Sequence, residues 1–280
     1  MKIANVAGRL TLIREGGGID VEAASGGRFG PDPQAVYGQW TAFRDWAEHA
    51  PSGPVTPIDN GDLGAPAPRP AQVFAIGMNY RDHAAETGLP VPDSPATFTK
   101  FPTCITGPFA DVVLPSDVVD WEIELVVVIG VRAYRVSSAG AWDHVAGVTV
   151  GQDLSERVVQ FAGGGQFSLG KSFPGFGPTG PWLVTPDELA NPDDLELGCS
   201  VDGQEVQKSR TSQLVFGVPE LIARLSAVLP LLPGDVIFTG TPAGIGATRQ
   251  PAQFLRPSQI LTSYIEGVGT MANRLIAPPA

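Results

Sequence analysis

The sequence predicts a β-rich α+β fold with short helices, preceded by a small α/β N-terminal domain. The 280 residues include 34 glycines and 27 prolines, spread along the chain without a period, which is typical of many short strands joined by turns. Several β-branched runs end at a glycine, as buried strands often do. Helical spacing of apolar residues is confined to a few segments, above all residues 33–49 and 218–228.

The chain is predicted to divide into a small N-terminal domain, residues 1–67, and a main domain, residues 68–280. The boundary lies within the stretch from Pro51 to Pro70, which is rich in proline, glycine and aspartate and is predicted to be a linker. The elements expected in the first domain are strands at Lys2 to Val6 and Arg9 to Ile13 and a helix from Pro33 to His49.

The main domain is expected to consist of short strands with few helices. Strands are predicted at residues 72–77, 125–130, 145–151 and 236–238, a hairpin over 195–207 and a helix over 218–228. The turn of the hairpin is marked by Asp202-Gly203, a pair that favours the tight turn between antiparallel strands.

Composition excludes several classes of partner. The net charge of −11 argues against nucleic acid, because no basic stripe is present to neutralise phosphates. Cys104 and Cys199 lie far apart, without the spacing of a zinc site or a disulfide framework, and are interpreted as buried thiols of a reducing compartment. The amino terminus lacks the apolar stretch of a signal peptide, and no run of about eighteen apolar residues occurs. We therefore expect a cytoplasmic protein with no membrane partner.

Three carboxylates are the main candidates for a metal site. Glu122 and Glu124 flank one residue just before a β-branched run, and residues two apart on a strand point to the same face. Two like charges beside an apolar strand repel each other, so a divalent cation is expected to neutralise them. Asp153 follows the run 145–151, where a second strand ends. Carboxylate ligands favour Mg²⁺, Mn²⁺ or Ca²⁺ over zinc or copper. A solvent-facing strand margin is the alternative for the two glutamates.

His83 and Glu86 are candidates for activating water. They lie three residues apart, so on a short helix they would share one face. A glutamate bonded to an imidazole fixes its tautomer and raises its basicity, as a general base requires. A structural role is the alternative for His83. The residues predicted to cap this helix are Asn79 or Asp82. The other histidines, each explained by solvation or a local hydrogen bond, are His49 and His144.

Further polar residues lie near these candidates in the sequence. Lys171 stands alone among glycine, proline and aromatic residues, where an ammonium could stabilise an oxyanion or enolate, although an exposed loop lysine is the common alternative. Arg157 and Gln160 follow Asp153 by four and seven residues, so a helical turn would place a guanidinium to bind a substrate carboxylate. The loop 239–246 offers backbone N–H groups to an anion, but its spacing does not imply ATP.

Five motifs occur in one order along the chain. They are NYRDHAAETG, DWEIELVVVIG, GQDLSERVVQ, GKSFPGFGPTGPW and PGDVIFTGTPAGIG. Together they resemble the fumarylacetoacetate hydrolase family over about residues 70–275, and the first 67 residues resemble the small N-terminal domain of longer members. The stretch from Glu86 to Pro92 is similar to hydrolases of 2,4-diketo-3-deoxy sugar acids and to 2-hydroxyhepta-2,4-diene-1,7-dioate isomerases. The resemblance implies a mixed, largely antiparallel β-roll with short helices, usually a homodimer.

The resemblance also implies a role for each motif residue. The implied metal ligands are Glu122, Glu124 and Asp153. The implied catalytic residues are His83 and Glu86, which activate water, and Lys171, near the reacting carbonyls. The residues implied to surround the substrate carboxylate are Arg157, Gln160 and Thr241. Two positions depart from the family pattern, since Gln152 precedes the aspartate and Val158 follows the arginine, so a carboxylate that supports the site in many members is missing here.

These residues lead to an expected reaction. We expect Mg²⁺- or Mn²⁺-dependent cleavage of a carbon–carbon bond in a small-molecule oxo acid, a 2,4-diketo acid, giving pyruvate and a second acid; Ca²⁺ could take the same site in crystals. Isomerisation or decarboxylation of a related oxo acid, such as hydroxyheptadienedioate or oxaloacetate, needs the same site and is the nearest alternative. A binding paralogue without turnover is the third.

Overall fold

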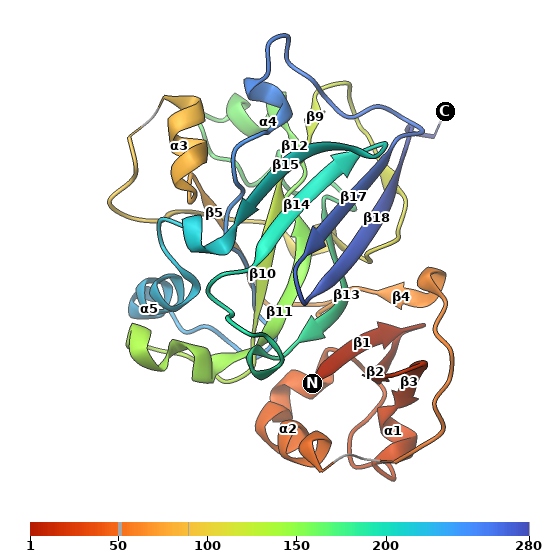
Figure 1. Cartoon of the computed structure of the whole chain (residues 1–280). Coiled ribbons are helices and arrows are strands. Elements are labelled where there is room, and N and C mark those ends of the chain that lie inside the picture. The colour runs from red at the N-terminus through yellow and green to blue at the C-terminus, as the bar shows by residue number, and fades with distance from the viewer. Residues whose placement is uncertain (50–51, 89, 280) are drawn as a thin grey trace.

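The computed structural model describes residues 1–49, 52–88 and 90–279, which form two main sheets with short helices around them (Figure 1). The strands are β1 (Lys2–Val6), β2 (Arg9–Arg14), β3 (Gly17–Asp20), β4 (Leu63–Gly64), β5 (Val73–Gly77), β6 (Ala96–Thr99), β7 (Ile105–Thr106), β8 (Val112–Val113), β9 (Val119–Asp120), β10 (Ile123–Ile129), β11 (Val145–Gln152), β12 (Ser155–Glu156), β13 (Gly177–Val184), β14 (Glu196–Val201), β15 (Gln204–Arg210), β16 (Val236–Phe238), β17 (Ile260–Ile265) and β18 (Gly269–Ile276). The helices are α1 (Val21–Ala24), α2 (Trp40–Glu48), α3 (Arg81–Thr87), α4 (Arg157–Ala162) and α5 (Val218–Val228). Short 3₁₀ helices cover residues 35–39, 60–62, 102–104, 138–144, 186–188, 211–213 and 246–248.

The larger sheet has the strand order β3-β2-β1-β13-β11-β10-β16-β5-β6, with β4 paired to β1 and β7 to β13. Most of its pairs are antiparallel, whereas β5 runs parallel to β16 and β7 parallel to β13. The smaller sheet has the order β15-β14-β17-β18-β8, and β9 pairs separately with β12. The predicted β-rich α+β class, mixed and largely antiparallel, is therefore confirmed.

Strand β10 divides the hydrophobic core. Its odd-numbered residues, such as Leu125 and Val127, belong to a cluster that includes Leu197 and Met271 of the smaller sheet. Its even-numbered residues Val126 and Val128 belong to a second cluster that includes aromatic residues of α2. Side chains alternate between the two faces of a strand, so Glu122 and Glu124 lie on the even-numbered face. The strand register thus fixes where both carboxylates point.

The N-terminal segment continues the larger sheet, because β1 pairs with β13 through Ile3 and Leu183 (Figure 1). Part of the stretch predicted to be a linker is built into this sheet, since β4 pairs with β1 and residues 65–67 are buried. The linker prediction is therefore wrong for residues 63–67, of which the first two pair as a strand and the other three are buried. Its first residue, Pro51, lies outside the described residues, as does Leu89 of the Glu86 to Pro92 stretch.

The local predictions can be compared with the observed elements. Asp202 and Gly203 both have positive φ angles, 50° and 80°, as the predicted tight hairpin turn requires. Helix α5 covers the predicted residues, whereas the predicted helix 33–49 begins as a 3₁₀ turn before α2. Among the described residues, no helix is both long and apolar enough to cross a membrane.

Candidate active site

Two neighbouring strands bring the three carboxylates together. Strands β10 and β11 are antiparallel, and Glu124 lies opposite Gly151. Asp153 therefore follows β11 beside the start of β10, where its backbone N–H donates to the Glu122 carbonyl oxygen over 2.9 Å. All three side chains are buried, and one oxygen from each lies within 4.8 Å of the others. The carboxylates thus form one compact, oxygen-only cluster.

Two buried lysines neutralise part of this cluster. Lys171 Nζ lies 2.7 Å from Glu122 Oε2 and 2.7 Å from Asp153 Oδ2. Lys100 Nζ lies 2.6 Å from Asp153 Oδ1, and it also donates to the carbonyl oxygens of Lys171 and Phe176. Sequence reasoning missed Lys100. It follows Thr99 at the end of β6, where a lysine is ordinarily exposed, so the sequence carried no signal for its burial.

The pKa values of the two glutamates are shifted in opposite directions, although the residues are only two apart. Burial raises the pKa of Glu122, but the charges of Lys171 and Arg157 outweigh it and bring the pKa down to about 2. Burial raises the pKa of Glu124 well above its usual range, and the charges of Asp153 and Glu122 raise it further. A backbone N–H, that of Gly240, donates to Glu124 Oε2 over 2.7 Å. Glu124 is therefore the carboxylate with the least compensation by positive charge.

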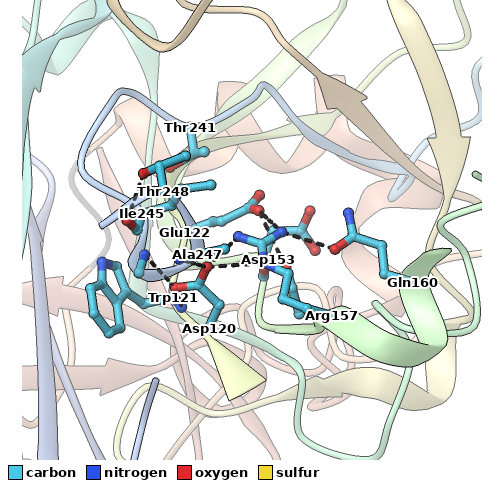
Figure 2. Close-up of polar contacts among 12 residues, drawn as sticks. Asp120, Trp121, Glu122, Asp153, Arg157, Gln160, Thr241, Ile245, Ala247 and Thr248 are labelled. Carbon is cyan, nitrogen blue, oxygen red and sulfur yellow. Dashed lines mark hydrogen bonds and ion pairs between the residues drawn. The ribbon is translucent and has the colours of Figure 1, made fainter. Parts of the chain in front are cut away.

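Arg157, at the start of α4, connects the cluster to a fourth carboxylate. Its Nη1 donates to Glu122 Oε1 over 2.8 Å and to Gln160 Oε1 over 2.9 Å (Figure 2). Its Nε and Nη2 both donate to Asp120 Oδ2, over 2.9 and 2.6 Å. The expectation that a supporting carboxylate is missing is therefore corrected, because Asp120 supplies one from another strand. Asp120 lies two residues before Glu122, and residues two apart in an extended chain point to the same face. This spacing is the sequence feature that could have identified Asp120.

Helix α3 carries the predicted histidine–glutamate pair. His83 Nδ1 lies 2.9 Å from Glu86 Oε2, and His83 is buried. Glu86 Oε1 accepts hydrogen bonds from Gly244 N over 3.0 Å and from Thr248 Oγ1 over 2.7 Å, so the carboxylate is fixed from the loop on its other side. The ring is therefore held by an oriented acidic partner, as general-base chemistry requires.

The capping prediction for this helix is wrong. Tyr80 occupies the N-cap position and makes no side-chain cap bond. The Asn79 amide instead donates to the carbonyl oxygens of Phe216 and Thr239, and its oxygen accepts from Phe216 N. Asp82 Oδ1 accepts from the N–H of the next residue, His83. Long-range partners thus replaced the local bond that the sequence suggested.

A cavity of about 210 Å³ brings most candidate residues together. Its polar lining is His83, Glu122, Arg157, Gln160, Lys171 and Thr241. Its apolar lining is Ile76, Met78, Phe98, Phe161, Phe167 and Ile245, with Gly77 between them. Thr241 Oγ1 donates to the Ile123 carbonyl oxygen over 3.0 Å and accepts from Gln207 Nε2 over 2.8 Å, so its hydroxyl ties the loop to β10. The lining therefore combines six polar and six apolar side chains.

The other two histidines lie outside this lining. His49 Nδ1 lies 2.6 Å from the Asp45 carbonyl oxygen, at the end of α2. His144 Nδ1 lies 3.1 Å from the Arg132 carbonyl oxygen. The hydrogen bond of His49 is local, as the sequence suggested, whereas that of His144 reaches back 12 residues.

The charges of the site fit a divalent cation. Four buried carboxylates, those of Asp120, Glu122, Glu124 and Asp153, face three cations. These cations are Lys100, Arg157 and Lys171. With all four carboxylates ionised, as they would be around a bound cation, these seven residues leave one negative charge in excess, next to three carboxylates whose oxygens suit a hard cation. A dication would turn this excess into one positive charge, which suits an anionic substrate.

Comparisons with known proteins place the chain in a family. The family model described as "Fumarylacetoacetate (FAA) hydrolase C-terminal" matches residues 72–276. The mitochondrial oxaloacetate tautomerase FAHD2A of Bos taurus is 44% identical over 226 residues, which are 80% of this chain and 72% of that protein.

Solved structures are similar over the whole chain. A Mycobacterium smegmatis protein, provisionally named HpcE, is 53% identical with a TM-score of 0.96, and 100% of each chain is covered. The 2-hydroxyhepta-2,4-diene-1,7-dioate isomerase of Mycobacterium marinum is 29% identical with a TM-score of 0.77, again over 100% of each chain. The maleylpyruvate hydrolase of Sphingobium sp. SYK-6, in complex with manganese(II) and pyruvate, is 28% identical with a TM-score of 0.82 over 100% of each chain.

Proposed function

The chain belongs to the fumarylacetoacetate hydrolase family, whose members here include hydrolases, isomerases and a tautomerase, and on this basis we propose that it is a metal-dependent hydrolase of 2,4-diketo acids. It cleaves the bond between C3 and C4 and releases pyruvate and a second acid. One observation carries the proposal: the oriented His83, the buried Lys171 and the candidate ligand Glu122 line a single cavity.

Glu122, Glu124 and Asp153 would hold the metal, Mg²⁺ or Mn²⁺. Their oxygens lie close enough together to share one ion. The manganese(II) and pyruvate bound to the maleylpyruvate hydrolase support this assignment. When bound, the ion supplies a Lewis acid that polarises the 2-oxo group of the substrate.

His83 is the proposed general base. Since Glu86 holds Nδ1, Nε2 is the ring nitrogen that takes a proton from water. The water oxygen bonds to C4, the C3–C4 bond breaks, and its electron pair leaves on C3 as the enolate of pyruvate. Protonation of C3, by the imidazolium or by water, gives pyruvate, and C4 becomes the carboxyl group of the second acid. Atoms and charge balance without a further reactant.

Lys171 and Arg157 provide positive charge in the cavity lining. Lys171 lies within reach of both Glu122 and Asp153, so its ammonium is positioned to stabilise the negative charge of a departing enolate. Arg157, with Gln160 and Thr241 nearby in the lining, is the proposed contact for the substrate carboxylate. Lys100 lies behind Asp153 and is outside the cavity lining, so it fixes that side chain and does not contact substrate.

The apolar lining residues suggest which acyl part the substrate carries. Phe98, Phe161 and Phe167 form consecutive edge contacts, with ring centroids 5.5 Å apart in each pair. Among the described residues of the lining, the lysine and the arginine are the only cations of fixed charge, and both already pair with carboxylates. A second, distal carboxylate would be desolvated there without a cation. The proposed substrates are therefore acylpyruvates with an apolar acyl group.

A tautomerase or isomerase is the second candidate, favoured by the 44% identity to an oxaloacetate tautomerase. Such a reaction needs the same polarised oxo acid, with the histidine moving a proton between carbon and oxygen. Decarboxylation of oxaloacetate has the same requirement. A binding paralogue without turnover is disfavoured by the complete set of polar residues around one cavity.

The assembly that we propose is a homodimer. Four apolar side chains are exposed on and beside α4, namely Phe101, Val158, Phe161 and Leu169, with exposures of 49%, 65%, 58% and 64%. Burial of this surface by a second copy would shield them and cover the cavity near Phe161. Light scattering is expected to give twice the chain mass, and the monomer mass would contradict it. Val158→Glu is expected to shift the mass toward the monomer.

The reaction is tested by product analysis. The purified protein with Mn²⁺ is incubated separately with acetylpyruvate, benzoylpyruvate, oxaloacetate and 2-hydroxyhepta-2,4-diene-1,7-dioate. Pyruvate without carbon dioxide from the acylpyruvates supports the hydrolase. Enol–keto exchange of oxaloacetate without pyruvate supports the tautomerase, and carbon dioxide release supports a decarboxylase. Absence of pyruvate from every acylpyruvate would overturn the proposal.

A further inference from the structure

Asp120 is buried at the centre of the site, yet it lies outside both the cavity lining and the ligand cluster. It ends β9, whose pairing with β12 places it opposite Ser155, next to the start of α4. Its two oxygens accept five hydrogen bonds from the protein. Because the lone pairs of the carboxylate are used, Asp120 has no capacity left for a metal or substrate. Its role must be exerted through its partners.

One set of partners leads to the metal ligands. Oδ2 accepts from Arg157 Nε and Nη2, over 2.9 and 2.6 Å, and the same guanidinium donates to Glu122 Oε1. Figure 2 shows the guanidinium between the two carboxylates. A planar guanidinium fixed on one side can present its remaining N–H groups in only one direction. The position of Glu122 therefore depends on Asp120.

The other set of partners leads to the histidine–glutamate pair. Asp120 Oδ1 accepts from Gly246 N over 2.7 Å, and Oδ2 accepts from Ala247 N over 2.9 Å. The flanking residues of this loop, Gly244 and Thr248, are those that donate to Glu86 Oε1. Asp120 thus fixes the middle of the loop whose two ends orient Glu86.

The close approach of this loop is specific to glycine. A Cβ atom at position 246 would lie 1.9 Å from the Gln253 carbonyl oxygen and 2.7 Å from Asp120 Oδ1. Both contacts are shorter than real Cβ atoms show, so a side chain here would push the loop away from Asp120. The absence of a side chain at Gly246 is what allows both backbone N–H groups to reach the carboxylate.

We propose that Asp120 is a positioning residue that couples the metal-binding arm, Arg157 and Glu122, to the water-activating arm, the loop 244–248 with Glu86 and His83. This inference rests on the proposed function, because it assigns the two arms their roles. Disturbing either arm shifts the other, since both are bonded to one carboxylate. Removal of the charge at Asp120 alters both metal affinity and the state of the His83 ring.

Asp120→Asn is the direct test, because it keeps the shape of the side chain. Every position around the two oxygens is occupied by an N–H donor, so an amide NH₂ faces a donor in either orientation. The expected result is a Mn²⁺ dissociation constant raised about 10- to 100-fold in calorimetry, the range for outer partners of metal ligands. In the metal-free protein, the imidazole ¹⁵N shifts of His83 are expected to move toward those of a Glu86→Gln variant. With three histidines in the chain, a His83→Gln spectrum assigns them.

Asp117→Asn is the matched control, the same change at an exposed position three residues earlier, and it is expected to move neither readout. An unchanged Mn²⁺ affinity or unchanged His83 shifts in a folded Asp120→Asn variant would overturn the coupling. Where the Asp120→Asn variant does not fold, Arg157→Lys takes its place, because lysine keeps the positive charge but loses the forked contact with Asp120. His83 ¹⁵N shifts identical to those of the wild type in the Arg157→Lys variant would overturn the proposal. Neither readout needs turnover. A wild-type protein that binds Mn²⁺ but cleaves no acylpyruvate would therefore contradict the proposed function alone.

Discussion

The antiparallel pair of β10 and β16 has a buried acidic region at each end, and the two regions are stabilised differently. At one end Asp235, just before β16, accepts hydrogen bonds from the backbone N–H groups of Gln72 and Leu232 and from the Gln72 side chain, over 3.0, 2.7 and 2.6 Å. At the other end, Glu122 and Glu124 face a third carboxylate, with cations between them. One end is a single acid held by neutral donors, and the other is a cluster of acids and cations.

This difference separates a structural acid from a functional one. Neutral donors satisfy Asp235 completely, so it joins Gln72 to the turn before β16 and needs nothing more. At the other end four buried carboxylates, counting Asp120, face three cations, so with all four ionised one negative charge is left in excess, which makes the three clustered ones a candidate site for a cation. We call the end with Glu122, Glu124 and Asp153 the clustered end and the end with Asp235 the structural end. Substitutions at the clustered end are therefore expected to change metal binding and turnover, and those at the structural end only stability.

The largest effect is expected at Glu124. Glu124→Gln keeps the shape but removes the charge of a candidate ligand, so the Mn²⁺ dissociation constant should rise by more than the roughly 100-fold typical of outer partners. Turnover of acylpyruvates should fall with it. Calorimetry with Mn²⁺ measures the affinity, and exposed Glu205→Gln is the control. Wild-type affinity in the Glu124 variant would remove this residue from the ligand set and weaken the contrast between the two ends.

His83→Ala tests whether metal binding and turnover at the clustered end depend on different residues. Loss of a general base typically costs about 10²- to 10⁴-fold in rate. Turnover should therefore be nearly abolished, whereas Mn²⁺ affinity should stay close to that of the wild type, because the three carboxylates are unchanged. His49→Ala, at an exposed histidine, should alter neither. A loss of Mn²⁺ binding in the His83 variant would contradict its role as a base.

Phe161→Arg tests the absence of a distal cation in the cavity lining. Phe161 is part of the lining and is 58% exposed, so an arginine there can reach a distal carboxylate while staying hydrated. We expect kcat/KM for fumarylpyruvate to rise about 10-fold relative to that for benzoylpyruvate, a modest charge-assisted gain. Val228→Arg, at an exposed apolar residue outside both the lining and the proposed dimer surface, should leave the ratio unchanged. A wild-type preference for fumarylpyruvate would refute the apolar assignment.

How far the sequence predicts the clustered end depends on the range of each contact. Alternation along one strand places Glu122 and Glu124 on the same face, and the end of the next strand brings Asp153 beside them. The contact between His83 and Glu86 lies within one helical turn. These positions follow from local periodicity, so the sequence contained enough information to find them.

The sequence did not reveal the partners that come from distant segments. Lys100 meets Asp153 across 53 residues, and Asp120 meets Arg157 across 37, through strand pairings that no local pattern specifies. The cap predicted at Asn79 failed for the same reason, since Phe216 lies 137 residues away. Asp235 was visible only within the motif PGDVIFTGTPAGIG. Long-range polar partners follow from the strand order, which a single sequence does not state.

Asp235→Asn tests the structural end. An amide can accept on one side only, so at least one buried N–H loses its partner, at a cost of about 1–3 kcal/mol in the free energy of unfolding. Urea unfolding measures this loss, and Asp117→Asn at an exposed site is the control. Mn²⁺ affinity should not change. A weakened affinity would show that the two ends of the strand pair are coupled, against the separation argued here.

The smallest effect is the pH dependence of that loss. Burial raises the pKa of Asp235 above 3.8, although hydrogen bonds from Leu232 and Gln72 oppose it. The folded state therefore holds the proton more tightly than the unfolded chain, and the resulting stability is fully present below 3.8 and is lost as pH rises through the folded pKa. The asparagine variant has no such group, so its deficit in unfolding free energy should be largest in acid and shrink as pH rises. A deficit that grows with pH would mean that the neutral donors, and not burial, determine the pKa, and that this end stabilises a charge after all.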